Sequence, residues 1–167
     1  MSSVYRNILV AVDGSPDAEA ALTHASALAR DQRARLTLLT AIPPIPATAL
    51  LATGAAPPRG EVVNHYSELL RRATDALPDD ISVTTLLVEG PAAKALIERA
   101  RSGAFDLIVM GSHGHGRLHQ SLLGYVSQKV LHASPIPVLL MRAAAEATAS
   151  VPAPVIESSL DISPLTS

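Results

Sequence analysis

Two short stretches carry residue types that could bind a charged ligand, and each follows an apolar run. The first is Asp13-Gly14-Ser15, which combines a carboxylate, a glycine and a hydroxyl. The second, GSHGHG, runs from Gly111 to Gly116. Glycines let the backbone approach a ligand closely, and successive backbone N–H groups can form a concave site for an anion. We therefore expect a phosphate-bearing ligand at the second stretch.

A further glycine, Gly124, begins a helix-like pattern, and nine residues separate it from Gly114. The first N–H groups of a helix have no intrahelical partner, and the helix dipole also favours an anion there. Ser127 would add a hydroxyl to this turn, and Arg117 or Lys129 a positive charge. The two turns together predict the phosphate end of a nucleotide site.

Asp13 calls for a different partner, because an ionised carboxylate only accepts hydrogen bonds and would repel a phosphate. A ribose hydroxyl or the amino group of a base suits it, although its stretch could also be a plain strand-to-helix turn. Three histidines, His113, His115 and His119, raise the alternative of a zinc site. Their spacing does not place them on one helix face, and no carboxylate is near them in sequence, so we expect no metal site there.

Strands that alternate with helices must position these residues. Short apolar runs rich in branched residues predict strands buried on both faces, and helical spacing of apolar residues predicts the helices between them. The expected strands cover 7–12, 35–42, 81–88, 106–110 and 136–141, and the expected helices cover 16–29, 61–77, 91–102 and 124–133. Proline and glycine recur through 43–60, which predicts a loop or mobile flap.

This order predicts an α/β fold with a parallel sheet and helices on both faces. Open parallel sheets bind ligands beyond the carboxyl ends of their strands, where the strand order reverses. In a sheet of order 3-2-1-4-5 the first and fourth strands are neighbours at that point. The stretches that begin at Asp13 and at Gly111 would then face one crevice.

Length and composition limit the remaining classes. The chain has 167 residues, 48% of them hydrophobic and 17% charged, which fits one domain over 1–142 with a flexible tail over 143–167. It has no cysteine, so disulfides and thiolate metal sites are excluded. A formal charge of −2 argues against nucleic acid as a partner. No apolar run approaches the roughly 20 residues that cross a bilayer, so a cytoplasmic location without membrane contact is expected.

Three segments, NILVAVDGS, MGSHGHG and GYVSQKVLHASPIPVLLM, resemble the universal stress protein family, and the similarity covers about residues 3–142. Nucleotide-binding members carry the pattern G-x2-G-x9-G-[ST], which Gly111, Gly114 and Gly124 match in both spacings. The resemblance implies a doubly wound, Rossmann-like, five-stranded sheet in order 3-2-1-4-5. It also implies a homodimer joined along the fifth strand, and bound ATP with Mg²⁺ or Mn²⁺.

The resemblance also assigns site residues. Asp13 would contact the ribose or the adenine, and the backbone near Thr40 and Ala41 would bracket the adenine. The residues expected around the ribose and phosphates are Met110, Gly111, His113, Gly114, Gly124, Tyr125, Val126 and Ser127. Tyr125 departs from the family pattern, which has serine or threonine there, so a short hydroxyl beside the phosphates is lost.

Taken with the predicted nucleotide site, the resemblance implies an ATP-binding regulatory module of the stress response that acts as a homodimer. One alternative is a slow ATP hydrolase or phosphotransferase, although only the histidines offer a base near the phosphates. Another is a nucleotide-free interaction protein with an empty crevice, which Tyr125 would favour. The choice between ATP, AMP and a cyclic nucleotide stays open at this point.

Overall fold

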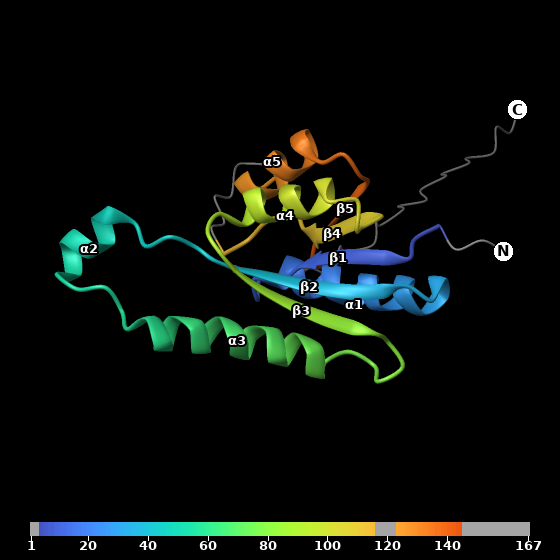
Figure 1. Cartoon of the computed structure of the whole chain (residues 1–167), viewed down its shortest axis with the longest axis horizontal. Coiled ribbons are helices and arrows are strands. Elements are labelled where there is room, and N and C mark those ends of the chain that lie inside the picture. The colour runs from blue at the N-terminus through green and yellow to red at the C-terminus, as the bar shows by residue number, and fades with distance from the viewer. Residues whose placement is uncertain (1–3, 116–122, 145–167) are drawn as a thin grey trace, which may run out of the picture.

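The computed structural model describes residues 4–115 and 123–144. Five strands in these residues form one parallel sheet in the order β3-β2-β1-β4-β5, which confirms the predicted fold class and strand order (Figure 1). The strands are β1 (Asn7–Ala11), β2 (Arg35–Ile42), β3 (Val83–Glu89), β4 (Leu107–Gly111) and β5 (Val138–Met141). The helices are α1 (Pro16–Gln32), α2 (Ala47–Thr53), α3 (Arg59–Asp75), α4 (Ala92–Arg101) and α5 (Tyr125–Ala133).

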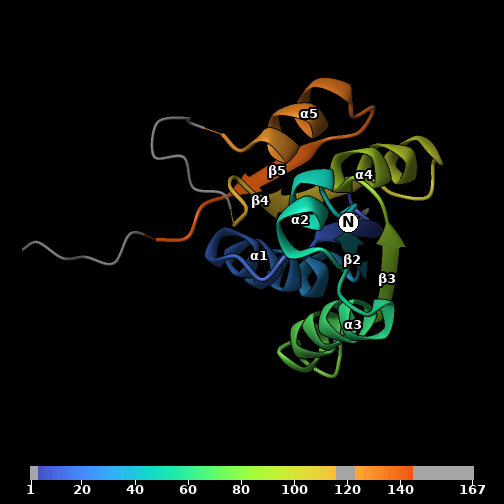
Figure 2. The same ribbon diagram turned by 90° about the vertical axis from the view of Figure 1, so that its left-hand side faces the viewer.

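Helices cover both faces of the sheet, with α1 and α3 on one side and α4 and α5 on the other (Figures 1 and 2). Successive side chains of a strand point to opposite faces. Ile8 and Val10 accordingly pack in the cluster with α1 and α3, while Leu9 packs in the cluster with α4 and α5. All three are fully buried, which explains why β1 has a continuous apolar sequence rather than an alternating one.

The turn from β1 into α1 has residues that are typical of a helix start. Ser15 is the N-cap of α1, and its hydroxyl accepts a hydrogen bond from the Ala18 N–H at 3.3 Å. Pro16 is the first helical residue, where its missing N–H costs nothing. This tight turn places the first turn of α1 next to the carboxyl end of β4, and the two elements are in contact.

The prediction of a loop throughout 43–60 was wrong, because α2 occupies Ala47–Thr53 and α3 already begins at Arg59. The prolines and glycines flank α2 rather than interrupt it. Alanine and leucine, which have high helix propensity, fill its interior, and Gly54 ends it in the left-handed conformation with φ of 69°. None of its residues is buried.

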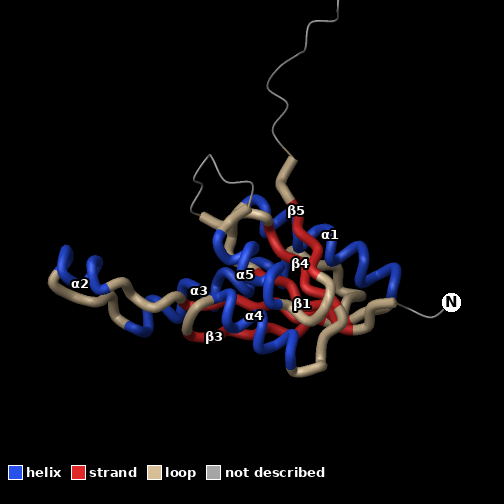
Figure 3. The backbone as a smooth tube through the Cα atoms, turned by 90° about the horizontal axis from the view of Figure 1, so that it is seen from above, coloured by secondary structure: helices blue, strands red, loops and turns tan. Residues whose placement is uncertain are grey.

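Helix α2 projects away from the rest of the chain, beyond the carboxyl ends of the strands (Figures 1 and 3). The expected tail begins at residue 143, but residues 145–167 lie outside the described part of the chain, as do Arg117 and His119. The flexibility of the tail and the division into a domain and a tail therefore stay predictions. Among residues 4–115 and 123–144, no helix is long and apolar enough to cross a membrane.

Candidate functional site

A cavity of about 320 Å³ lies at the carboxyl ends of the strands. Strand β1 pairs with both β2 and β4, so the strand order reverses there, as expected for a ligand site in a parallel sheet. All eleven site residues expected from the sequence line this cavity: Asp13, Thr40, Ala41, Met110, Gly111, His113, Gly114, Gly124, Tyr125, Val126 and Ser127. The structure thus brings them together, while their part in binding stays a prediction.

Sequence reasoning did not assign nine other residues that line the cavity. Seven of these nine residues are apolar or aromatic: Ala11, Val12, Ala18, Leu39, Tyr66, Ala92 and Leu96. Tyr66 belongs to α3, where helical spacing marks it only as a residue of the apolar face. His115 also lines the cavity, and its Nε2 donates a hydrogen bond to the backbone carbonyl of Asp13.

The glycines of the second stretch are explained first by close packing. A Cβ at Gly111 would lie 2.8 Å from backbone atoms of Asp17 and Ala18, so only glycine lets β4 end against α1. A Cβ at Gly114 would lie 2.8 Å from the carboxylate Oδ2 of Asp13. The two stretches predicted to share one crevice therefore meet at this point.

The Gly111–Gly114 turn is joined to the start of α5 through Ser112. The Gly124 N–H donates to the Ser112 carbonyl at 2.8 Å. The buried Ser127 hydroxyl lies 2.9 Å from the Gly111 carbonyl and 3.0 Å from the Ser112 carbonyl. This hydroxyl, which the sequence suggested for a phosphate, therefore stabilises the turn in this structure.

Helix α5 presents its first N–H groups at the cavity. Its first backbone hydrogen bond runs from the Gln128 N–H to the Gly124 carbonyl at 3.0 Å. The N–H groups of Tyr125, Val126 and Ser127 precede that bond and have no partner inside the helix. All three residues line the cavity, so the helix start can receive an anion there.

The opposite side of the cavity carries a backbone edge of β2. Leu39 accepts a hydrogen bond from the Val12 N–H at 2.9 Å, and the β1 pairing ends there. Alternation along a strand turns the Ala41 N–H and carbonyl to the same side as those of Leu39, past the end of β1. Ala41 thus offers a donor and an acceptor to the cavity. The buried Thr40 hydroxyl donates to the Val12 carbonyl at 2.7 Å and fixes this edge.

Asp13 and Tyr125 lie at the open part of the site. The exposed Asp13 carboxylate accepts a hydrogen bond from the Ser15 N–H at 2.8 Å, which stabilises the turn and leaves its other oxygen beside Gly114. The Tyr125 side chain is 70% exposed, and the Lys129 ammonium lies 4.4 Å from the centre of its ring. Lys129, which the sequence suggested for a phosphate, therefore contacts the Tyr125 ring in this structure.

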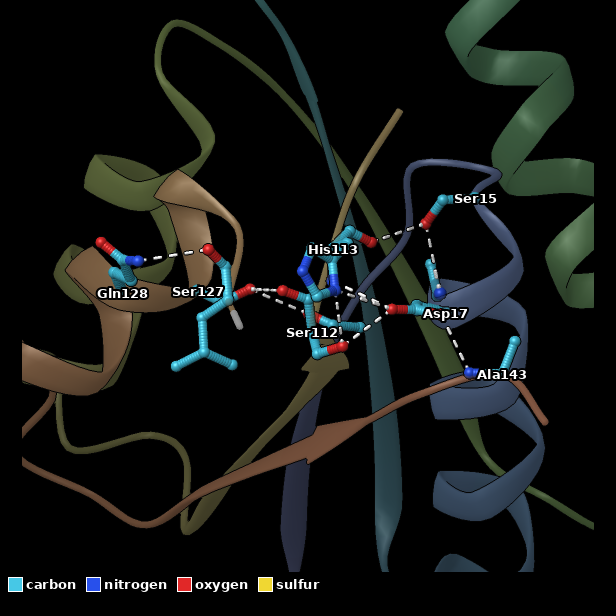
Figure 4. A network of polar contacts seen from close by, with 10 residues as sticks. Ser15, Asp17, Ser112, His113, Ser127, Gln128 and Ala143 are labelled. Carbon is cyan, nitrogen blue, oxygen red and sulfur yellow. Dashed lines mark hydrogen bonds and ion pairs between the residues drawn. The ribbon is translucent and has the colours of Figure 1, made fainter. Parts of the chain in front are cut away.

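A buried carboxylate outside the two stretches singled out in the sequence supports the site from behind. Asp17 is 4% exposed, and its Oδ2 accepts hydrogen bonds from the Ser112 hydroxyl at 2.8 Å and the His113 N–H at 3.1 Å (Figure 4). Its Oδ1 accepts from the Ala143 N–H at 2.9 Å. Burial alone would raise the pKa of this carboxyl, but the hydrogen bonds from Ala143, Ser112 and His113 outweigh it and lower the pKa.

The described residues contain no group of three or more histidine, cysteine or acidic side chains that could hold a metal ion. The zinc alternative involved His113, His115 and His119, and the last of these lies outside the described residues. Of the other two, His113 lies with Nδ1 3.0 Å from the Ser112 hydroxyl.

Comparison with known proteins places this site in context. A sequence model described as "Universal stress protein family" matches residues 4–142. A protein of Thermus aquaticus, "Universal stress protein in QAH/OAS sulfhydrylase 3'region", is 34% identical over 142 residues, which cover 83% of this chain and all of that protein.

Solved structures show the same fold. The universal stress protein UspA from Lactobacillus plantarum superposes with a TM-score of 0.68 at 25% identity, over 83% of this chain and 98% of its own. A universal stress protein crystallised in complex with cAMP superposes with a TM-score of 0.64, also at 25% identity, over 84% of this chain and 99% of its own.

Proposed function

The chain belongs to the universal stress protein family, and we propose that it is a regulatory module that binds an adenine nucleotide in this cavity. The observation that carries the proposal is that two sets of backbone hydrogen-bonding groups lie on opposite sides of one cavity. The start of α5 offers three N–H groups to an anion, and the Ala41 edge offers a donor and an acceptor to a flat polar ligand. A base linked through a sugar to a phosphate matches that arrangement.

At the base end, Ala41 would donate its N–H to a ring nitrogen of adenine and accept the exocyclic amino group at its carbonyl. An adenine edge presents an acceptor nitrogen next to an amino donor, so one residue can satisfy both. The apolar side chains of Val12, Ala92 and Leu96 line the same cavity and would cover the faces of the base. Asp13 lies between this end and the glycine turn, where its free oxygen would accept a ribose hydroxyl.

At the phosphate end, the N–H groups of Tyr125, Val126 and Ser127 would donate to phosphate oxygens. Each is a hydrogen bond to a charged group, worth roughly 1.5–3 kcal/mol. Mg²⁺ or Mn²⁺ would neutralise the charge of a triphosphate. Because the donors belong to the backbone, they remain although Tyr125 replaces the serine or threonine of the family pattern. The lost hydroxyl weakens ATP about tenfold or more by the same reasoning.

The complex of a family member with cAMP supports an adenine nucleotide as the class of ligand. We propose ATP, as the glycine spacing of Gly111, Gly114 and Gly124 indicates, with AMP as the comparison that tests how many phosphates the site accepts.

We also propose a homodimer joined along β5. This strand is at the edge of the sheet, and all four of its apolar side chains are only partly buried.

Titration calorimetry of the full chain with ATP, AMP, cAMP and GTP, each with and without Mg²⁺, tests the proposal. We expect saturable 1:1 binding of ATP per chain, and binding of GTP at least tenfold weaker. Heat changes that do not saturate with any adenine nucleotide would contradict the proposal. Sedimentation equilibrium of the same sample tests the dimer, and a monomer at all concentrations would refute that part alone.

A further inference from the structure

Asp17 is a buried charge that the proposed binding contacts do not use. It is the second residue of α1 and 4% exposed, and it does not line the cavity. A buried carboxylate is strongly destabilising unless hydrogen bonds replace its water. Helix capping does not explain it, since Ser15 already caps α1. The residues that compensate this charge therefore indicate what it does.

The carboxylate joins three segments that are far apart in the sequence. Its Oδ2 holds the turn after β4, through the Ser112 hydroxyl and the His113 N–H. Its Oδ1 holds the segment after β5, through the Ala143 N–H. Asp17 itself belongs to the segment after β1. Figure 4 shows these partners converging on the carboxylate from two sides.

The contacts continue from Asp17 to the phosphate end of the cavity. Ser112 donates its hydroxyl to Asp17, while its carbonyl accepts the Gly124 N–H at 2.8 Å and lies 3.0 Å from the Ser127 hydroxyl. The position of Ser112 therefore sets the position of the first turn of α5. Gly111 adds a steric constraint, since it packs against the α1 backbone with no room for a Cβ.

We propose that Asp17 is the positioning residue of the phosphate end of the cavity. It holds the Ser112–His113 turn against α1, and through the Ser112 carbonyl it aims the N–H groups at the start of α5 toward the phosphate. The bond to Ala143 fixes the carboxylate from the other side, so that both of its oxygens are committed. This role rests on the nucleotide-binding function proposed above. Asp17 would orient the backbone N–H groups that donate hydrogen bonds to the phosphate.

This role predicts a selective effect, because the base end of the cavity does not depend on Asp17. The Ala41 edge is held by the pairing with β3 and by the Thr40 hydroxyl. Asp17→Asn keeps the shape of the side chain but replaces one acceptor oxygen by an N–H₂ group. In either orientation of the amide, this N–H₂ group would face a hydrogen-bond donor: the Ala143 N–H on one side, or the Ser112 hydroxyl and the His113 N–H on the other. AMP should then bind about tenfold more weakly, as for one lost hydrogen bond to a charged group, while adenosine stays within about twofold of wild type.

The test measures AMP and adenosine affinities of the full chain by competition with a fluorescent adenine nucleotide. The variants are Asp17→Asn, Ser112→Ala, the double variant and Glu19→Gln. Glu19 is an exposed acid in the same helical turn, so its variant controls for charge and helix dipole. Ser112→Ala should lower the AMP affinity about threefold by losing one hydrogen bond, and the double variant should be no worse than Asp17→Asn alone. Glu19→Gln should match wild type.

Each outcome bears on a different claim. A fall in AMP affinity with adenosine unchanged supports the positioning role. Equal AMP-to-adenosine ratios in wild type and Asp17→Asn overturn it, whether both affinities are unchanged or both fall. If Asp17→Asn does not fold by circular dichroism, the ratio in Ser112→Ala decides in the same way. If wild type binds neither AMP nor ATP, the proposed function fails, and this inference falls with it.

Discussion

Gly124→Val tests the phosphate end of the cavity most sharply. Gly124 has φ of −70° and ψ of 159°, which any residue adopts, so the substitution introduces no backbone strain. A Cβ there would lie 3.2 Å from the Ser112 carbonyl oxygen and 3.3 Å from the His113 Cα. Both neighbours are backbone atoms and cannot rotate away. The valine side chain must therefore push the start of α5 away from the glycine turn.

The size of the effect follows from the contacts that would be displaced. Overpacking of this kind costs about 1–3 kcal/mol of the free energy of unfolding. If one N–H of the first turn of α5 loses its phosphate, about 1.5–3 kcal/mol of binding free energy is lost, which is about 10- to 150-fold in affinity. Gly124→Ala should fall between wild type and valine, because its single methyl needs a shift of only a few tenths of an ångström.

Titration calorimetry with ATP and AMP measures the affinity, and urea unfolding measures the stability of each variant. Gly60→Ala is the matched control, because a Cβ at Gly60 meets nothing within 4 Å and Gly60 lies in α3, outside the set of residues that line the cavity. We expect it to bind as wild type does. A folded Gly124→Val variant with wild-type affinity for both nucleotides would refute the role assigned to the start of α5.

Three other perturbations test the remaining parts of the site. Thr40→Val removes the buried hydroxyl that donates to the Val12 carbonyl, and it should lower the free energy of unfolding in urea by about 1–3 kcal/mol. A decrease below about 0.5 kcal/mol would mean that water replaces this hydrogen bond. Ala41→Pro removes an N–H that faces the cavity rather than β3, so the far-ultraviolet circular dichroism should stay unchanged. The affinity for adenosine should drop at least about fivefold. An unchanged affinity would mean that the base does not bind at Ala41. Hydrogen bonds lower the pKa of Asp17 in the folded state, so this carboxyl takes up a proton first in the unfolded chain as the pH falls below about 4. The stability of wild type should therefore fall more steeply in that pH range than the stability of Asp17→Asn. Parallel slopes in acid unfolding would contradict that assignment.

The parts of the fold that could be predicted are those in which local sequence and burial agree. The run at 35–42 is bounded by charged and proline residues, and β2 has those same bounds. The strand that includes Asn7 and Val10 reads as buried on both faces because helices cover both sides of the sheet. Strand order followed from the family resemblance and not from these local patterns.

Helix α2 was missed for a local reason. The segment 43–60 has prolines and glycines at its ends, and their density outweighed the run of alanine and leucine between them. The helix buries none of its residues, so it leaves no apolar face in the sequence that would mark it. Its two ends, Pro46 and Gly54, are typical helix boundaries that a position-by-position interpretation would have used.

The support of the candidate site was out of reach because it depends on contacts between distant residues. Asp17 lies 95 positions from Ser112 and 126 from Ala143, and no local pattern relates them. From the sequence alone, an acid in the first turn of α1 would be expected to interact with the helix dipole, which is the role of an exposed residue there. Gly111 shows the same limit: its spacing indicated a phosphate, whereas its nearest constraint is the α1 backbone.

Nucleotide binding at the start of α5 can be tested directly by incubating the full chain with ATP and Mg²⁺ and removing free nucleotide on a desalting column. The protein is then denatured, and the released nucleotide is quantified by chromatography with mass spectrometry. We expect about one adenine nucleotide per chain for wild type and for Gly60→Ala, and much less for Gly124→Val. Equal amounts from all three proteins, or none from wild type, would contradict binding at the start of α5.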